Sequence, residues 1–152
     1  MFRAIKDYAA RLKTKASAQT STPGRPLRVL VVDDEEPVRK FVDRVLQKAG
    51  YETTLASDGP DAIEIAQKIR PLDILVTDLM MPLMSGDELA RRLRQSEPGL
   101  KVLYLTAYSD RLFKEKTTLW QDEAFLEKPC SVKGLVEAVS LLRSGRLDAP
   151  EK

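Results

Sequence analysis

The chain has 152 residues with one cysteine, no histidine and a formal net charge of +2. Its length favours one domain with a sizeable core. The lack of histidine excludes imidazole acid–base catalysis, histidine metal ligands and a phosphohistidine on this chain. The single cysteine excludes an internal disulfide and is typical of a reducing compartment, so we expect a cytoplasmic protein. No apolar run approaches the roughly 20 residues of a membrane span, and no signal peptide is evident.

The N-terminal region differs in charge from the rest of the chain. Residues 1–28 contain seven Lys and Arg residues but one acid, and the remainder is mildly acidic. Apolar side chains recur at helical spacing from Phe2 to Leu12, and residues 14–26 have the composition of a flexible linker. We therefore expect a basic arm at residues 1–25. Three interpretations stay open for it: a frayed tail, a short amphipathic helix that binds a partner, and a membrane-surface element.

Apolar runs alternate with helical patterns along the chain. Strands are predicted at residues 28–32, 51–56, 73–77, 101–106 and 124–128. Each is followed by apolar residues at helical spacing, and these helices are predicted within residues 37–49, 57–70, 85–95, 109–121 and 131–145. Five strands that each lead into a helix predict an α/β fold with a doubly wound parallel sheet and helices on both faces.

Polar side chains stand where four of the five predicted strands end, and ligands of such sheets bind at that edge. They are Asp33 with Asp34, then Asp78, Thr106 and Lys128. Each has an ordinary explanation alone, such as acids that favour a helix N-terminus. Together, three carboxylates repel one another unless a hard divalent cation lies among them, and a lysine with a hydroxyl suits a phosphoryl group. We interpret the next two residues, Glu35 and Glu36, as first-turn helix acids with at most a steering role.

The segments VVDDE, LVTDLMMPLMSG, VLYLTAY and FLEKP resemble the receiver domain of two-component response regulators. Forty-four residues separate Asp34 from Asp78, and twenty-two separate Thr106 from Lys128, both near what the family has. The resemblance covers residues 26–145 and leaves residues 146–152 as a short C-terminal tail without an output domain. It implies a flavodoxin-like (βα)5 sheet in the strand order 2-1-3-4-5 and a stand-alone, single-domain regulator.

The resemblance also implies the roles of the strand-end residues. Asp78 would be the phosphoacceptor. Mg²⁺ would be bound directly by Asp34, Asp78 and the backbone carbonyl of Met80, with Asp33 acting through water. Lys128 and the Thr106 hydroxyl would each contact a phosphoryl oxygen. Such a domain is a signalling switch that catalyses only its own phosphotransfer and autodephosphorylation, not a metabolic enzyme.

Some positions depart from the usual family pattern or have two interpretations. Phe125 would be the switch residue that rotates inward when Thr106 moves toward the phosphoryl group, but it has no hydroxyl, and it could instead be ordinary core. Cys130 replaces a frequent Phe and is interpreted as packing. By the resemblance, Met80 and Tyr108 flank the approach of water to the phosphorus. Met80 has no strong hydrogen-bonding group to orient a water, and Tyr108 is bulky enough to obstruct one, unless it points out to solvent. We therefore expect slow autodephosphorylation, over minutes or longer. Family precedent also implies a cis peptide bond before Pro129.

Other function classes have little support in the sequence. A nucleotide-binding domain would need a glycine-rich phosphate loop after the first strand, and none is present. An aspartate-based phosphatase usually has a D-x-D pattern there. We expect phosphoryl transfer from a sensor histidine kinase or a histidine phosphotransfer protein. The downstream protein target is unknown and is expected to bind the face formed by residues 109–121, 124–128 and 131–145. Nucleic-acid binding is not expected. The alternative is a phosphorelay intermediate or the terminal receiver of a hybrid histidine kinase.

Overall fold

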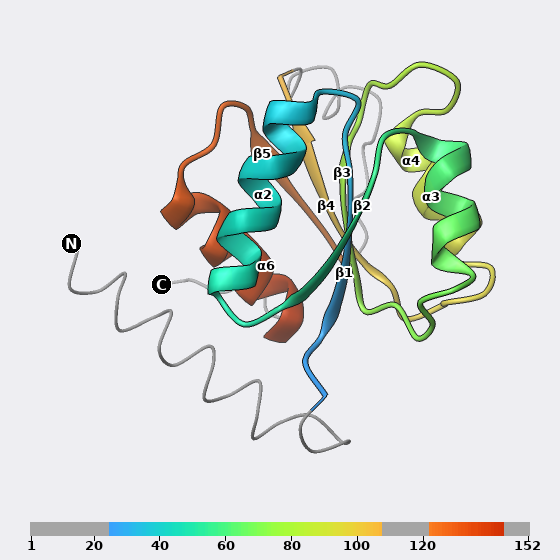
Figure 1. Ribbon diagram of the computed structural model, residues 1–152, viewed down its shortest axis with the longest axis horizontal. Helices are drawn as coiled ribbons and strands as arrows, with labels where there is room; N and C mark the ends of the chain where they lie inside the picture. Colours follow the sequence, from blue (N-terminus) through green and yellow to red (C-terminus); the bar gives the residue numbers. More distant parts are fainter. Residues whose placement is uncertain (1–24, 108–121, 145–152) are drawn as a thin grey trace.

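The computed structural model describes residues 25–107 and 122–144, which form a five-stranded sheet between layers of helices (Figure 1). The strands are β1 (Arg28–Val32), β2 (Glu52–Ala56), β3 (Ile74–Asp78), β4 (Lys101–Thr106) and β5 (Glu123–Glu127). They pair in parallel in the order β2-β1-β3-β4-β5. The predicted fold class and strand order are confirmed.

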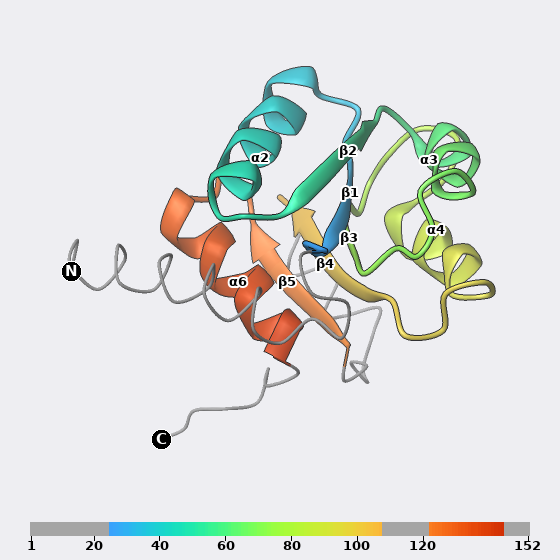
Figure 2. The same ribbon diagram turned by 60° about the horizontal axis from the view of Figure 1, so that its bottom comes forward.

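The helices of the described residues cover the two faces of the sheet. Helices α2 (Glu36–Lys48) and α6 (Val132–Ser144) lie on one side, and α3 (Gly59–Ala66) and α4 (Gly86–Leu93) lie on the other (Figure 2). The alternation of side chains along each strand explains the two layers. In β1, Val29 and Val31 pack in the cluster under α2 and α6, whereas Leu30 packs in the cluster under α3 and α4. The predicted helix at residues 109–121 and the arm before residue 25 lie outside the described residues.

Several element boundaries differ from the prediction: β2 begins at Glu52, β5 spans Glu123–Glu127, and α2 begins at Glu36, in addition to the two differences that follow. The helix predicted within residues 57–70 ends at Ala66, because the following turn is tightened by bonds from Lys68 N–H to Ile65 O and from Ile69 N–H to Ala66 O. Pro71 also disfavours the helical conformation at Arg70, the residue before it. The third strand begins one residue later than predicted. Asp73 instead accepts hydrogen bonds from the Arg25 guanidinium and from Arg28 N–H, at 3.3 and 2.8 Å.

The peptide bond before Pro129 is cis, as family precedent implied, and so is the bond before Pro71. No helix of the described residues is both long and apolar enough to cross a lipid bilayer.

A buried ion pair joins the end of α4 to the start of β5. Arg94, the C-cap residue of α4, places its guanidinium 2.8 Å from the Glu123 carboxylate, which also accepts a hydrogen bond from the Tyr104 hydroxyl at 3.1 Å. Burial, reinforced by the charge of Glu123, raises the pKa of Tyr104 far above its usual value, so this hydroxyl stays protonated and donates. No sequence pattern predicted this cluster, because its residues come from three separate elements.

Because both charges are largely buried, removing one partner should be costly. Arg94→Met should lower the free energy of unfolding by about 3–5 kcal/mol, since it leaves the Glu123 carboxylate buried without the guanidinium. The double variant Arg94→Met, Glu123→Leu should recover part of that loss, because no carboxylate is left buried without the guanidinium, although the Tyr104 hydroxyl loses this acceptor. Urea unfolding of the three proteins measures both effects. An Arg94→Met protein within about 1 kcal/mol of the wild type would contradict the assignment.

Candidate functional site

The site lies at the carboxyl edge of the sheet, where consecutive parallel strands deliver polar residues side by side. Asp33 directly follows β1, Asp78 is the last residue of β3, Thr106 is the last residue of β4, and Lys128 directly follows β5. This edge is at the top of Figure 1. The four strand ends that carry polar residues therefore converge, because all strands run the same way.

The structure brings the three predicted acids together. One carboxylate oxygen from each of Asp33, Asp34 and Asp78 lies within 4.8 Å of the other two. Asp33 and Asp78 are 1% and 8% exposed, whereas Asp34 is exposed. The Lys128 ammonium lies 3.0 Å from the Asp33 carboxylate and 3.4 Å from that of Asp78. The ammonium group of Lys128 thus contributes one positive charge beside a cluster of three carboxylates.

Backbone contacts hold the acids in place. The Asp33 carboxylate accepts a hydrogen bond from Glu35 N–H at 2.9 Å, and Asp33 O accepts one from the Arg39 guanidinium at 2.6 Å. The Asp78 carboxylate accepts a hydrogen bond from Met80 N–H at 3.3 Å. Lys128 N–H donates to Thr106 O at 3.0 Å, which ties the ends of β4 and β5 together. These contacts therefore hold the side chains of the site and the backbone that carries them in fixed positions.

Gly86 closes the loop behind the Asp78 carboxylate. Its N–H donates to Leu79 O at 2.8 Å. A Cβ at this position would lie 2.3 Å from the backbone oxygen of Asp78, closer than any real contact. The later glycine of the LMMPLMSG segment is therefore needed for a close approach of backbone to backbone, and any larger residue would displace the strand end that carries Asp78.

The surroundings disfavour the charged form of Asp78. Burial raises its pKa to about 6, and the charge of Asp33 adds to this, while Lys128 and the Met80 N–H act in the opposite direction. Burial alone would favour a neutral Lys128, but the charges and hydrogen bonds of Asp33 and Asp78 together raise its pKa. Lys128 thus stays protonated, and its single charge does not offset the carboxylates.

The donor set can hold a hard cation. All the clustered side-chain ligands are carboxylate oxygens, and one of the acids is exposed, so a cation has access from solvent. Oxygen-only donors suit Mg²⁺ or Ca²⁺, and Mg²⁺ typically uses one or two carboxylates and keeps several waters. An ion of this kind would stabilise the site, because it would neutralise the excess negative charge of partly buried carboxylates.

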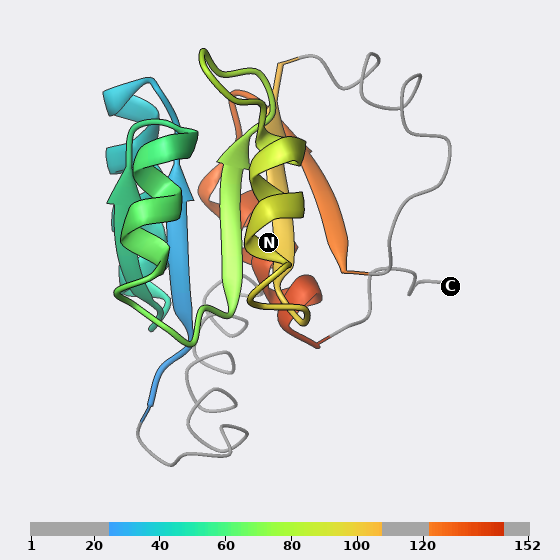
Figure 3. The same cartoon turned by 90° about the vertical axis from the view of Figure 1, so that its right-hand side faces the viewer.

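The loop between β3 and α4 presents apolar side chains beside this acidic centre. It projects beyond the carboxyl edge of the sheet (Figure 3). Leu83 is 80% exposed and has a φ of 74°, and Met84 N–H donates to Pro82 O across it, so Leu83 is the centre of a strained three-residue turn. Met80 is 39% exposed. Among residues 25–107 and 122–144, no packing contact explains the strain or the exposure of Leu83.

Two contacts of the site were not predicted from the sequence. Glu35, interpreted as a first-turn acid, is the N-cap residue of α2, and its carboxylate lies 3.6 Å from the Lys128 ammonium. Arg39, one turn into the same helix, binds the backbone at Asp33. Their positions in the first turn of a helix that follows a strand end were visible signals, because that turn faces the same edge. Glu36 fits its interpretation and pairs with Lys40 at 3.0 Å.

The remaining predicted residues are placed only in part. Phe125 lies in β5, half-buried against the cluster under α3 and α4. Cys130 packs against the cluster on the other face, in agreement with its interpretation as packing, and burial raises the pKa of its thiol. Tyr108 lies outside the described residues.

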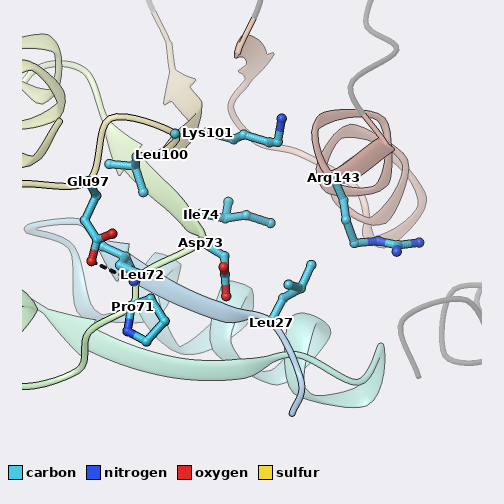
Figure 4. A pocket seen from close by; sticks show the side chains of 10 residues that line it. Leu27, Pro71, Leu72, Asp73, Ile74, Glu97, Leu100, Lys101 and Arg143 are labelled. Atoms are coloured by element: carbon cyan, nitrogen blue, oxygen red, sulfur yellow. Dashed lines mark hydrogen bonds between the residues drawn. The ribbon is translucent and has the colours of Figure 1, made fainter. Parts of the chain in front are cut away.

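A cavity of about 360 Å³ lies at the opposite, amino end of the sheet (Figure 4). It is lined by residues that begin β3 and β4, such as Ile74 and Lys101, and by Arg143 near the end of α6. None of the predicted site residues lines it. The chemistry indicated by the carboxylate cluster therefore does not take place in this cavity.

Comparisons with known proteins agree with the geometry. Residues 29–140 match the model of the response regulator receiver domain. Response regulator receiver protein CpdR of Brucella abortus is 34% identical over 112 residues, which cover 74% of this chain and 92% of CpdR. Sensor kinase CckA of the same organism is 37% identical over 112 residues, which cover 73% of this chain but 12% of the kinase.

A solved structure is also similar. Response regulator protein TrrA from Thermotoga maritima, in complex with Mg(2+)-BeF, aligns with a TM-score of 0.66 and 32% identity over 76% of this chain and 98% of TrrA. The family model covers most of the chain, and the sheet order is the one its members have. The chain therefore belongs to the response regulator receiver domain family and acts as a phosphoacceptor signalling switch.

Proposed function

We propose that Asp78 is the residue that receives the phosphoryl group, and that it does so with Mg²⁺ bound by Asp34, Asp78 and the backbone carbonyl of Met80, with Asp33 acting through water. The observation that carries this proposal is the cluster of three carboxylates at the end of the sheet, two of which, Asp33 and Asp78, also contact Lys128. When bound, Mg²⁺ supplies positive charge to the transferring phosphoryl oxygens.

The residues of the chain have separate tasks in this transfer. An Asp78 carboxylate oxygen attacks the phosphorus of a phosphohistidine, a bond forms between that oxygen and phosphorus, and the bond from phosphorus to the histidine nitrogen breaks. Lys128, held 3.4 Å from Asp78, binds a phosphoryl oxygen, and the Thr106 hydroxyl donates to another. Asp33 orients Lys128 through their 3.0 Å ion pair. Catalysis is then mainly positioning and charge stabilisation.

Switching would follow from the contact of Thr106 with the phosphoryl group and from movement of Phe125. Downstream, we propose a protein target on the face that includes β5 and α6, and a phosphorylated form that hydrolyses itself slowly.

The CckA match supports the alternative of a receiver from a hybrid kinase or a relay intermediate. Phosphotransfer from this protein back to a histidine phosphotransfer protein would distinguish the alternative. The domain boundaries, including the arm at 1–25 and the tail at 146–152, and the cytoplasmic location stay predictions.

The first test is phosphorylation by acetyl phosphate, a small donor that needs no partner protein. Wild-type protein should gain one acid-stable, base-labile phosphoryl group in Mg²⁺ and none in a chelator, because the carboxylates repel the incoming anion without the ion. Asp78→Asn should gain none under either condition. Intact-protein mass spectrometry measures both. Labelling of Asp78→Asn at the wild-type rate, or indifference to the chelator, would refute the proposal.

Metal binding separates the roles of two residues. Asp34→Ala should weaken Mg²⁺ binding about tenfold or more, since it removes a ligand. Thr106→Ala should change it less than about twofold, because its hydroxyl contacts only the phosphoryl group. Isothermal titration calorimetry of the two variants and the wild type provides the comparison. Equal affinity in all three proteins would remove Asp34 from the site.

The lifetime of the phosphorylated form tests the residues near the attacking water. Met80 is partly exposed beside Asp78 and has no strong hydrogen-bonding group in its side chain. Wild-type phospho-Asp78 should therefore last minutes or longer. Met80→Glu should shorten this about tenfold, the effect of about 1.4 kcal/mol of water positioning. Phosphate release after removal of the donor gives the rates. Decay of the wild type within seconds would contradict this account.

Leu83 allows a test of the protein phosphodonor. Its exposed, strained position in the loop that follows Asp78 is explained if a donor protein packs on it. Leu83→Ala keeps the backbone geometry but should slow phosphotransfer about tenfold from whichever histidine kinase phosphorylates the wild type fastest. The rate with acetyl phosphate should stay within about twofold of the wild type. Equal slowing with both donors would show that Leu83 supports the fold of the site instead.

A further inference from the structure

We infer that Tyr104 is a positioning residue for the switch: its ring holds Phe125 in the inner position and so favours the phosphorylated state. This inference rests on the proposed function, in which Thr106 and Phe125 respond to the phosphoryl group. It concerns a residue that makes no contact with the phosphoryl group.

The two rings are stacked across neighbouring strands. Tyr104 in β4 pairs in register with Phe125 in β5, and their ring centroids lie 5.3 Å apart with an interplanar angle of 11°. Tyr104 is fully buried, whereas Phe125 is half-buried and packs against the cluster under α3 and α4. An offset stack of this kind contributes beyond the apolar area that it buries.

The Tyr104 ring is fixed from its other end. Its hydroxyl donates to the Glu123 carboxylate at 3.1 Å, and that carboxylate is held by the Arg94 guanidinium at 2.8 Å. The same guanidinium donates to Leu100 O at 3.1 Å. Tyr104 is therefore anchored in the core, and Phe125 is the less buried of the two rings.

The positions of the two stacked rings along β4 and β5 also connect them to the site. Side chains two residues apart on a strand share a face of the sheet, so Tyr104 is on the same face as Thr106. Phe125 is three residues before Lys128 in the chain. In the proposed switch, Phe125 turns inward as Thr106 moves toward the phosphoryl group. We identify the position stacked on Tyr104, in which Phe125 packs against the cluster under α3 and α4, with this inner position. By linkage, a residue that stabilises it must then strengthen binding of a phosphoryl group at Asp78.

The probe is the phosphoryl mimic beryllofluoride with Mg²⁺, titrated by calorimetry at a temperature at which every variant is folded by circular dichroism. Tyr104→Leu removes the ring and should weaken beryllofluoride binding between about 2-fold and 10-fold, which corresponds to the about 0.5–1.5 kcal/mol of an aromatic pair. Tyr104→Met is a second ring-less variant in case the first does not fold. Affinity equal to or tighter than wild type in the ring-less proteins would overturn the inference.

Three controls separate the stack from general damage to the core. Leu103→Ala destabilises the same strand from its other face and should leave the affinity within about twofold of wild type. Tyr104→Phe keeps the ring and loses only its anchor, so it should weaken the affinity less than Tyr104→Leu does, and a loss as large as that of Tyr104→Leu would assign the effect to the hydroxyl instead. In a Phe125→Leu background, Tyr104→Leu should have no further effect on affinity, because the stack is already absent. An undiminished effect there would refute the stack.

The outcomes also separate this inference from the proposed function. A wild-type protein that does not bind beryllofluoride in the presence of Mg²⁺ would contradict the proposed function itself. A wild type that binds it, with ring-less variants that bind it equally well, would leave the function standing and refute the role of Tyr104.

Discussion

Three carboxylates and one lysine, packed together at the end of a parallel sheet, are the constraint around which this protein is built. Two of the three acids are almost fully buried, so their charges cannot be screened by water. Lys128 supplies one positive charge, 3.0 and 3.4 Å from two of them. The excess negative charge costs stability unless a further cation is bound. A chain selected for stability alone would replace these acids, so their presence favours a function for them.

The rest of the fold delivers and holds this arrangement. Parallel strands place their carboxyl ends at one edge, and four of those ends contribute polar groups. Three contacts then fix the loops. The Arg39 guanidinium donates to Asp33 O, Gly86 packs closely against the backbone of Asp78, and Lys128 N–H donates to Thr106 O. Below the site, β4 and β5 carry the stacked rings, and Glu123 at the start of β5 forms a buried pair with Arg94 at the end of α4. In the proposed switch, Phe125 connects movement at the edge to this interior.

Hydrophobic periodicity and the residues at strand ends were sufficient to predict the sheet and the carboxylate cluster. The parallel sheet was predictable because the apolar runs alternate with helical patterns, and the meeting of Asp33, Asp34 and Asp78 was predictable because parallel strands end at one edge. The strand order came from family resemblance. Contacts that depend on the path of a side chain were not predictable. Glu35 approaches Lys128 from a distant part of the chain, and the left-handed turn at Leu83 has no glycine or asparagine to mark it.

Unfolding of the wild type and of Asp78→Asn, each with and without Mg²⁺, tests most directly whether unneutralised charge dominates this site. The pKa of Asp78 is raised to about 6 in the folded protein, so its ionised form costs stability above that pH, and the cost disappears as the pH falls toward 4. At pH 7.5 in a chelator, Asp78→Asn should be more stable than the wild type by about 1–3 kcal/mol. Mg²⁺ should stabilise the wild type and close that difference while leaving the variant almost unchanged. An Asp78→Asn protein less stable than the wild type without Mg²⁺, or a wild type that Mg²⁺ does not stabilise, would contradict this account.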